Sequence, residues 1–317
     1  MQYRFLKPNG HVTEIELDNS LDIHSACWCS TNDEIAVGLT RKSGEGQLKV
    51  YESSGKSKIE IDCFEIYDCV YDKFNNNLLL SNGHTFFSCS PEQSKLHKLC
   101  KYSHIKYAPN RCSISPTGKY IGLLKYRADS DRFHVIDLEK KELIDVKLIC
   151  CSYSWIDDYT IIYSTVGGKI GYYDLRTRKK TNSQFNIKSI LASDSTSLTE
   201  LQNKIRKVEK EKLSWIHFDD PIRILDSTYF VMNSGKLAGS ALLKFEGSKY
   251  EVLFESDDKI QTYDLDNFNN ARMNISRSVN MKFSYYSLVQ ESGEFNHPNT
   301  DFYLNQNGRM NQLIRLK

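Results

Sequence analysis

The stretch that decides the fold is Arg111-Cys-Ser-Ile-Ser-Pro-Thr-Gly-Lys-Tyr-Ile-Gly-Leu-Leu-Lys125. An alternating apolar and polar run comes first, a Pro-x-Gly turn interrupts it, and a second apolar run follows, which is the pattern of two strands joined by a tight turn. Two more strand-like runs follow at 131–138 and 142–148, separated by the charged turn Glu139-Lys140-Lys141. Four short strands joined by tight turns predict one antiparallel meander.

The same unit recurs along the chain. Strand, turn, strand patterns occupy 26–38, 69–80 and 152–163, and further strand-like runs follow each of them. The second strands, anchored at Ile35, Leu78, Ile121 and Ile161, are separated by steps of 43, 43 and 40 residues. Blades of a β-propeller repeat at about 40–45 residues. We therefore expect an all-β chain that forms a single β-propeller domain over residues 1–317.

The period breaks near residue 195, where a helical pattern begins. Ser197-Leu-Thr-Glu200 has the form of a capping box, in which the serine hydroxyl and the glutamate carboxylate satisfy free amides at a helix start. Apolar residues then recur mostly at three- and four-residue spacing, at Leu198, Leu201, Ile205, Val208 and Leu213. This predicts a helix at 197–213, the only one longer than three turns, as an insertion (195–214) between blades.

The number of blades depends on the two ends of the chain. Strands resume at 222–232, 240–245 and 250–254, but the later runs at 259–265, 279–285 and 301–304 are less regular. The residues after 256 and the N-terminal hairpin of 3–17 together supply about 78 residues, enough for two blades. We expect seven blades, with strands from 1–18 closing the last one. Six blades with a longer final insertion is the alternative.

Three third-strand endings resemble one known family. Val135-Ile-Asp-Leu138, Tyr172-Tyr-Asp-Leu175 and Thr262-Tyr-Asp-Leu265, together with the repeat step, resemble the WD-repeat propellers over most of the chain. Ile-Asp or Tyr-Asp stands where that family has Trp-Asp. The resemblance implies a rigid, non-catalytic scaffold that mediates protein–protein interaction within a larger complex.

Composition and cysteine usage limit the classes of partner and the cellular compartment that we expect. The chain has 42 basic and 40 acidic residues, so its net charge of +2 does not make it a polyanion binder by bulk electrostatics. No apolar run approaches the ~20 residues that span a bilayer, and the first residues do not resemble a secretion signal. Nine cysteines, an odd number, lie partly within apolar runs. We expect reduced thiols, a cytoplasmic or nuclear location, and no membrane partner.

Residues for catalysis or metal binding do not form a known motif. His24, Cys27 and Cys29 come nearest to a metal set, but Cys27 and Cys29 share one strand face and Ala26 and Trp28 the other, as packing predicts. We therefore expect no metal, no cofactor and no enzyme. The turn pairs Asp157-Asp158, Asp219-Asp220 and Asp257-Asp258 leave open a propeller enzyme of hydrolase or glycosidase type, which would use paired carboxylates.

Two basic clusters are the candidate binding sites. Residues 176–180, Arg-Thr-Arg-Lys-Lys, are expected at a hairpin tip between third and fourth strands, and residues 204–212 lie on the predicted helix. We expect them to dock a partner protein with an acidic surface, through Arg176, Arg178, Lys179, Lys204, Arg206, Lys207 and Lys210. One alternative is a solvated helix face. Another is a nucleic-acid- or phosphate-binding propeller. The apolar helix face either packs on its own propeller or enters a partner's groove.

Overall fold

The structure is a computed structural model. It describes residues 2–6, 12–18, 20–29, 34–41, 43–102, 109–125, 132–165, 169–186, 216–218, 222–224, 227–234, 240–246, 249–256, 260–263, 283–287, 294–295 and 312–316. Side chains are described between residues 15 and 181, so the core and the contacts are those of the first four large sheets.

Four sheets of four antiparallel strands follow one another from residue 21 to residue 186, and in each the strand order follows the sequence. The first sheet contains β3 (Leu21–Cys29), β4 (Glu34–Arg41), β5 (Gly46–Tyr51) and β6 (Ser57–Cys63). The second contains β7 (Asp68–Asp72), β8 (Asn77–Ser81), β9 (Thr85–Cys89) and β10 (Leu96–Lys101). The third contains β11 (Pro109–Ile114), β12 (Tyr120–Lys125), β13 (Arg132–Asp137) and β14 (Glu142–Ile149). The fourth contains β15 (Ser152–Trp155), β16 (Thr160–Ser164), β17 (Lys169–Asp174) and β18 (Lys179–Asn186). The four repeats predicted from the sequence are therefore four sheets.

Two further sheets and one hairpin complete the described strands. The fifth sheet contains β19 (Ile216–Phe218), β20 (Ile222–Ile224), β21 (Ser227–Ser234), β22 (Ser240–Glu246) and β23 (Lys249–Ser256). In the last sheet the order is β24-β27-β25-β26, made from β24 (Ile260–Tyr263), β25 (Phe283–Ser287), β26 (Glu294–Phe295) and β27 (Gln312–Leu316). The hairpin pairs β1 (Gln2–Leu6) with β2 (Val12–Glu16), and these two strands form a sheet of their own. Whether they close the last blade stays a prediction.

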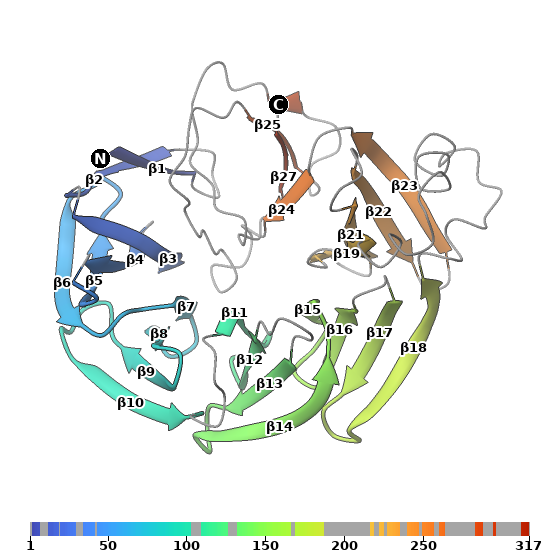
Figure 1. Ribbon diagram of the computed structural model, residues 1–317, viewed down its shortest axis with the longest axis horizontal. Helices are drawn as coiled ribbons and strands as arrows, with labels where there is room; N and C mark the ends of the chain where they lie inside the picture. The colour runs from blue at the N-terminus through green and yellow to red at the C-terminus, as the bar shows by residue number, and fades with distance from the viewer. Residues whose placement is uncertain are drawn as a thin grey trace.

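The sheets are arranged around a central axis (Figure 1). Successive sheets follow one another around it, with β7, β11, β15 and β19 toward the centre and β10, β14, β18 and β23 at the rim. No helix occurs in the part of the chain that the structure describes. The predicted helix at 197–213 and its insertion 195–214 lie outside the described residues, so both stay predictions, as does the count of seven blades.

The core lies between neighbouring sheets because their strands are buried on both faces. Along β8, Leu78 and Leu80 pack in a cluster with the first sheet, whereas Leu79 packs in a cluster with the third. A third cluster, containing Phe133 and Tyr153, joins the third and fourth sheets. Strands buried on both faces favour continuous apolar runs over alternation, and this accounts for Leu78-Leu79-Leu80.

All nine cysteines are free thiols in this structure. Seven are buried, and Cys63 and Cys151 are half-buried. Burial raises the pKa of the Cys63 and Cys89 thiols to about 11, because desolvation disfavours the thiolate. The cysteines therefore act as small apolar residues of the core.

A recurring aspartate shapes the turns at one end of the strands. Asp137 Oδ1 accepts hydrogen bonds from the backbone N–H groups of Glu139 and Lys140 at 3.1 and 3.0 Å. Asp174 Oδ1 accepts from Arg176 and Thr177 at 2.8 and 2.9 Å. These are the aspartates of the Ile-Asp and Tyr-Asp endings, and their side chains bond the backbone of the hairpin tip as turn aspartates commonly do.

Candidate functional site

In an antiparallel meander, the turns that join strands one to two and three to four lie at the same end of the sheet. The first turn of the second sheet and both such turns of the third and fourth sheets form what we call the turn surface, made of residues 72–76, 115–120, 138–141, 156–160 and 174–179. Backbone bonds join the two kinds of turn within a sheet: Leu138 N–H donates to Lys119 O at 3.1 Å, and Leu175 N–H donates to Tyr159 O at 2.8 Å.

Hydrogen bonds hold the turns of the third and fourth sheets together. The backbone N–H of Thr117 donates to Asp158 Oδ1 at 3.0 Å, and the Thr117 hydroxyl donates to Asp158 Oδ2. Lys119 Nζ donates to the Tyr159 hydroxyl at 3.1 Å. These partners lie 41 and 40 residues apart, close to one repeat step. The turn surface therefore has a fixed geometry across the junction between these two sheets.

Phe74 supplies the apolar part of the turn surface. Phe74 is 48% exposed, and it is one of three large apolar residues that are exposed among the described residues. Its ring lies against Gly118 in the first turn of the third sheet, so close that a Cβ built on Gly118 would overlap the ring. Gly118 also has φ of +79°, a region that residues with a Cβ avoid. Lys73 Nζ lies 5.2 Å from the Phe74 ring centroid.

Two cations lie against one tyrosine ring. Lys119 Nζ is 5.2 Å from the centroid of Tyr159, and it is 5.4 Å from that of Tyr120. Arg176 Cζ is 4.9 Å from the centroid of Tyr159. Arg176 also forms an ion pair with Asp174, with Nη2 and Oδ2 3.0 Å apart. Such cation–π contacts orient long side chains that would otherwise be mobile.

Two carboxylates of the turn surface, Asp158 and Asp174, have lowered pKa values. The side-chain hydrogen bond from Arg176, helped by the backbone N–H of Thr177, lowers the pKa of Asp174 to about 2. Burial raises the pKa of Asp158, but the hydrogen bonds from Thr117 outweigh it, and the net shift is downward. The hydrogen bond between Lys119 and Tyr159 raises the pKa of Lys119. Every one of these shifts favours the charged form.

The structure places three of the seven predicted site residues. Arg176 and Arg178 lie on the tip between β17 and β18, Lys179 begins β18, and all three side chains are exposed. The tip between third and fourth strands is therefore confirmed, with Arg178 in the left-handed region at φ of +56°. Lys204, Arg206, Lys207 and Lys210 lie outside the described residues.

Sequence reasoning missed three other residues of the turn surface, namely Phe74, Lys119 and Tyr159. Lys119 stands in the stretch Arg111–Lys125 that decides the fold, but only as part of a turn. The signal that could have found the pair is the repeat itself. Residues one step apart occupy equivalent positions on neighbouring sheets, and Lys119 and Tyr159 are 40 residues apart.

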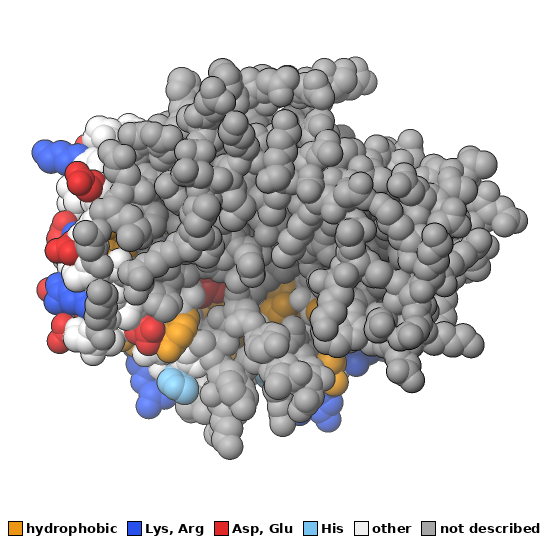
Figure 2. Space-filling view, turned by 45° about the horizontal axis from the view of Figure 1, so that its top comes forward, with side chains coloured by type: hydrophobic (Ala, Val, Ile, Leu, Met, Phe, Trp, Pro, Cys, Tyr) orange, Lys and Arg blue, Asp and Glu red, His pale blue; other side chains and the backbone are white. Residues whose placement is uncertain are grey.

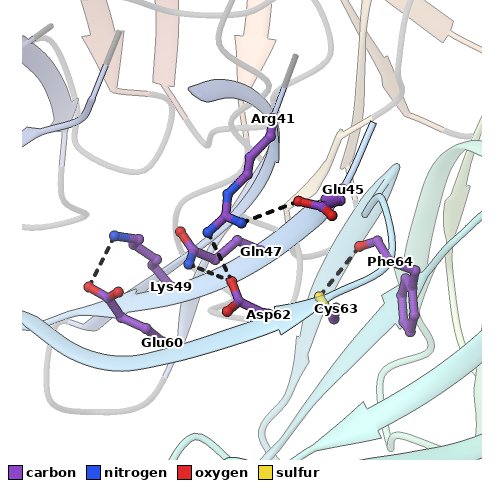
Figure 3. Close-up of polar contacts among 8 residues, drawn as sticks. All are labelled: Arg41, Glu45, Gln47, Lys49, Glu60, Asp62, Cys63 and Phe64. Carbon is purple, nitrogen blue, oxygen red and sulfur yellow. Dashed lines mark hydrogen bonds and ion pairs between the residues drawn. The ribbon is translucent and has the colours of Figure 1, made fainter. Parts of the chain in front are cut away.

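At the outer rim of the first sheet, cations are paired with carboxylates (Figure 3). Lys49 Nζ is 3.0 Å from Glu60 Oε1, and Arg41 lies 3.2 and 3.3 Å from Asp62 and Glu45. Blue and red side chains alternate along the left edge in Figure 2, where Figure 1 draws β6. Charged side chains on an edge strand discourage pairing with another chain.

Of the acidic pairs and the set of His24, Cys27 and Cys29, the structure describes only part. Asp157 Oδ1 accepts from the backbone N–H groups of Tyr159 and Thr160, both at 2.7 Å, as turn aspartates commonly do. The pairs at 219–220 and 257–258 and the side chain of His24 lie outside the described residues. Over the described part of the chain, no three His, Cys, Asp or Glu side chains come together as a metal site would require. The same part contains no helix long and apolar enough to cross a bilayer.

Comparisons with known proteins identify the fold. The sequence matches no protein-family model, and it matches no curated protein. The structure is similar to an oligogalacturonate lyase in complex with manganese, with a TM-score of 0.56 and 8% identity over 100% of this chain and 96% of that one. A chain of a mitotic checkpoint complex gives 0.53 and 10% identity over 79% of this chain and 70% of that one. An oligogalacturonate lyase from Vibrio parahaemolyticus gives 0.52 and 9% over 89% and 79%.

These neighbours have propeller-like folds, but one belongs to a mitotic checkpoint complex and the other two are oligogalacturonate lyases. Identities of this size relate folds and not activities. The all-β architecture, the repeated four-stranded antiparallel sheets and the structural neighbours together make this chain a β-propeller fold.

Proposed function

We propose that this chain is a non-catalytic propeller scaffold that binds another protein through the turn surface. One observation carries the proposal. An exposed aromatic side chain, Phe74, and the cations Lys119 and Arg176 are held on one surface by hydrogen bonds and ring contacts between sheets. Aromatic and arginine side chains dominate protein interfaces, and a preorganised surface loses little entropy on binding.

The mixture of charges favours a protein over a nucleic acid. The cations of the turn surface stand beside Asp157, Asp158 and Asp174, and the last two carboxylates have lowered pKa values. A continuous phosphate backbone would pass these carboxylates as well as the cations, and repulsion would offset part of the attraction. A protein segment can instead place single carboxylates where the cations are.

The carboxylate chemistry favours a binding surface over a glycosidase site. General acid catalysis by a glycosidase requires a carboxyl group with a raised pKa. Asp158 and Asp174 are shifted in the opposite direction, and Asp157 uses Oδ1 to bond the backbone of its own turn. The described carboxylates at this surface therefore support a structural role.

The finer features of the chain belong to the same proposal. We propose seven WD-repeat-like blades, a helical insertion at 195–214 whose basic face (Lys204, Arg206, Lys207 and Lys210) adds to partner binding, and a cytoplasmic or nuclear location. The repeat step and the capping box at Ser197-Leu-Thr-Glu200 support the first two features. Nine thiols without a disulfide support a reducing compartment.

The experiment that tests the function is an affinity capture from native lysate, followed by mass spectrometry. The tagged full chain, a Phe74→Ser/Lys119→Glu variant and a Lys147→Glu control are compared. Lys147 is exposed on β14, at the rim, so the control makes the same charge change away from the turn surface. A partner at constant stoichiometry should appear with the wild-type chain and the control and be lost with the double variant. Retention by all three proteins would refute the assignment of the binding surface.

A further inference from the structure

The turn surface contains cations that have no carboxylate partner in the described part of the chain. Lys119 contacts the Tyr159 hydroxyl and two rings, but no carboxylate lies within ion-pair distance of its Nζ there. Arg178 and Lys179, on the neighbouring tip, likewise form no ion pair among the described residues. By contrast, three cations of the first sheet, Arg41, Lys49 and Lys58, are each paired with a carboxylate.

The carboxylates near these cations are occupied by other donors. Asp158 accepts from the backbone and hydroxyl of Thr117, while Asp174 accepts from Arg176 and Thr177. Asp157 accepts from two backbone N–H groups. Rotation of a nearby carboxylate toward Lys119 would therefore break existing hydrogen bonds. An anionic group from outside the chain would satisfy the lysine without that loss.

The position of Lys119 is fixed, which matters for recognition. Its ammonium group lies over Tyr120 and Tyr159, and Tyr120 is only 8% exposed, so the stem of the lysine follows a buried ring. Gly118, the preceding residue, is covered by the ring of Phe74. The apolar ring of Phe74 and the ammonium group of Lys119 thus lie at two consecutive residues of one turn, Gly118 and Lys119.

We propose that the turn surface binds an acidic segment of a partner protein in which a large apolar side chain lies near a carboxylate. The apolar side chain packs on Phe74, and the carboxylate is received by Lys119, with Arg178 and Lys179 available to a second acidic residue. This inference rests on the proposed function and adds the chemistry of the partner. Interspersed Asp157 and Asp158 make the site selective for separate carboxylates over a continuous polyanion.

Selection of random peptides tests this chemistry without knowledge of the partner. Dodecapeptides displayed on phage are selected on the immobilised full chain and depleted on a Phe74→Ser/Lys119→Gln variant. The proposal predicts enrichment of Asp and Glu together with Phe, Tyr, Trp, Leu or Ile. Enrichment of basic or uncharged sequences, or no enrichment, would overturn it.

The enriched peptide is then synthesised with a fluorescein label, and its affinity is measured by fluorescence polarisation. Lys119→Gln and Phe74→Ser should each weaken binding about tenfold, while Lys119→Arg should retain most of the affinity and Lys147→Gln all of it. Raising the salt from about 50 to about 500 mM should weaken the wild-type chain more than Lys119→Gln. Unchanged thermal unfolding of each variant excludes a folding defect. A labelled polyphosphate or single-stranded oligonucleotide that binds more tightly than the peptide would also overturn the proposal.

The two proposals fail in distinguishable ways. If affinity capture finds a partner that depends on Phe74 but the selected peptides are not acidic, this inference is wrong and the scaffold function stands. If acidic peptides bind through Lys119 but no protein is captured through the turn surface, the chemistry stands and the scaffold function is wrong.

Discussion

Removing one buried hydroxyl should reveal how strongly the third and fourth sheets are coupled. Tyr153 is fully buried, and its hydroxyl donates to Gly122 O at 2.7 Å and accepts from Ser113 Oγ at 2.9 Å, so it joins β15 to both β11 and β12. Tyr153→Phe keeps the ring and its contact with Phe133, whose centroid is 4.5 Å away. The buried Ser113 hydroxyl then loses its acceptor, and the free energy of unfolding should fall by about 1–3 kcal/mol.

A double-mutant cycle separates this loss from a general packing defect. Ser113→Ala alone should cost about 0.5–1.5 kcal/mol. In the double variant there is no stranded serine hydroxyl, so the combined loss should be smaller than the sum by at least about 0.5 kcal/mol. Urea unfolding followed by tryptophan fluorescence measures all four proteins. Tyr67→Phe, which removes an exposed hydroxyl bonded to Glu65 at 2.8 Å, is the matched control and should change stability by less than about 0.5 kcal/mol. Additive losses, or a neutral Tyr153→Phe, would refute the coupling between sheets.

Three further predictions follow from the described contacts. Thiol titration of the denatured, unreduced chain should find about nine free groups, and six or fewer would contradict the reduced state. The thiols of the native chain should react slowly at pH 8, because burial raises the pKa of Cys63 and Cys89 to about 11. The ionised Asp174 side chain stabilises the fold fully above its ordinary pKa of 3.8, and this stabilisation is lost as the pH falls toward about 2. The difference in urea midpoint between the wild-type chain and Asp174→Asn should therefore shrink over that interval. A constant difference would be inconsistent with the ion pair. Gly46→Ala should destabilise the chain far more than Gly44→Ala in thermal unfolding, because a Cβ at Gly46 would overlap the carbonyl of Phe64. A Cβ at Gly44 would meet open space, so that substitution costs only the strain of a φ of +90°, about 1–2 kcal/mol. Equal losses would argue against the close approach of Phe64 to Gly46.

The periodic part of the fold could be predicted from local sequence because each repeat has its own turn signals. The runs around Ile35, Leu78, Ile121 and Ile161 all became second strands of four-stranded sheets. The sequence pattern does not single out strand β10, and its bulge explains why. The register shifts between Lys98 and Cys100, so the apolar residues of this strand do not alternate.

Long-range order was harder to predict than local strands. In the last sheet β27 lies between β24 and β25, although it follows both in sequence, and no local pattern encodes such an order. The tip 176–180 was recognised from its charge, but Phe74 and Lys119, which belong to the same turn surface, come from two other sheets. Their approach depends on how the sheets pack, which the sequence expresses only through the repeat step.

The most direct test of a protein-binding turn surface is differential acetylation of lysines, measured by mass spectrometry on the chain alone and in the complex recovered by affinity capture. We predict that Lys73, Lys119 and Lys179 lose reactivity in the complex, because they lie under the partner. Lys98 on β10 and Lys147 on β14, both exposed at the rim, should react equally in the two states. Protection of the rim lysines with no change at Lys119 would show that the partner does not bind the turn surface.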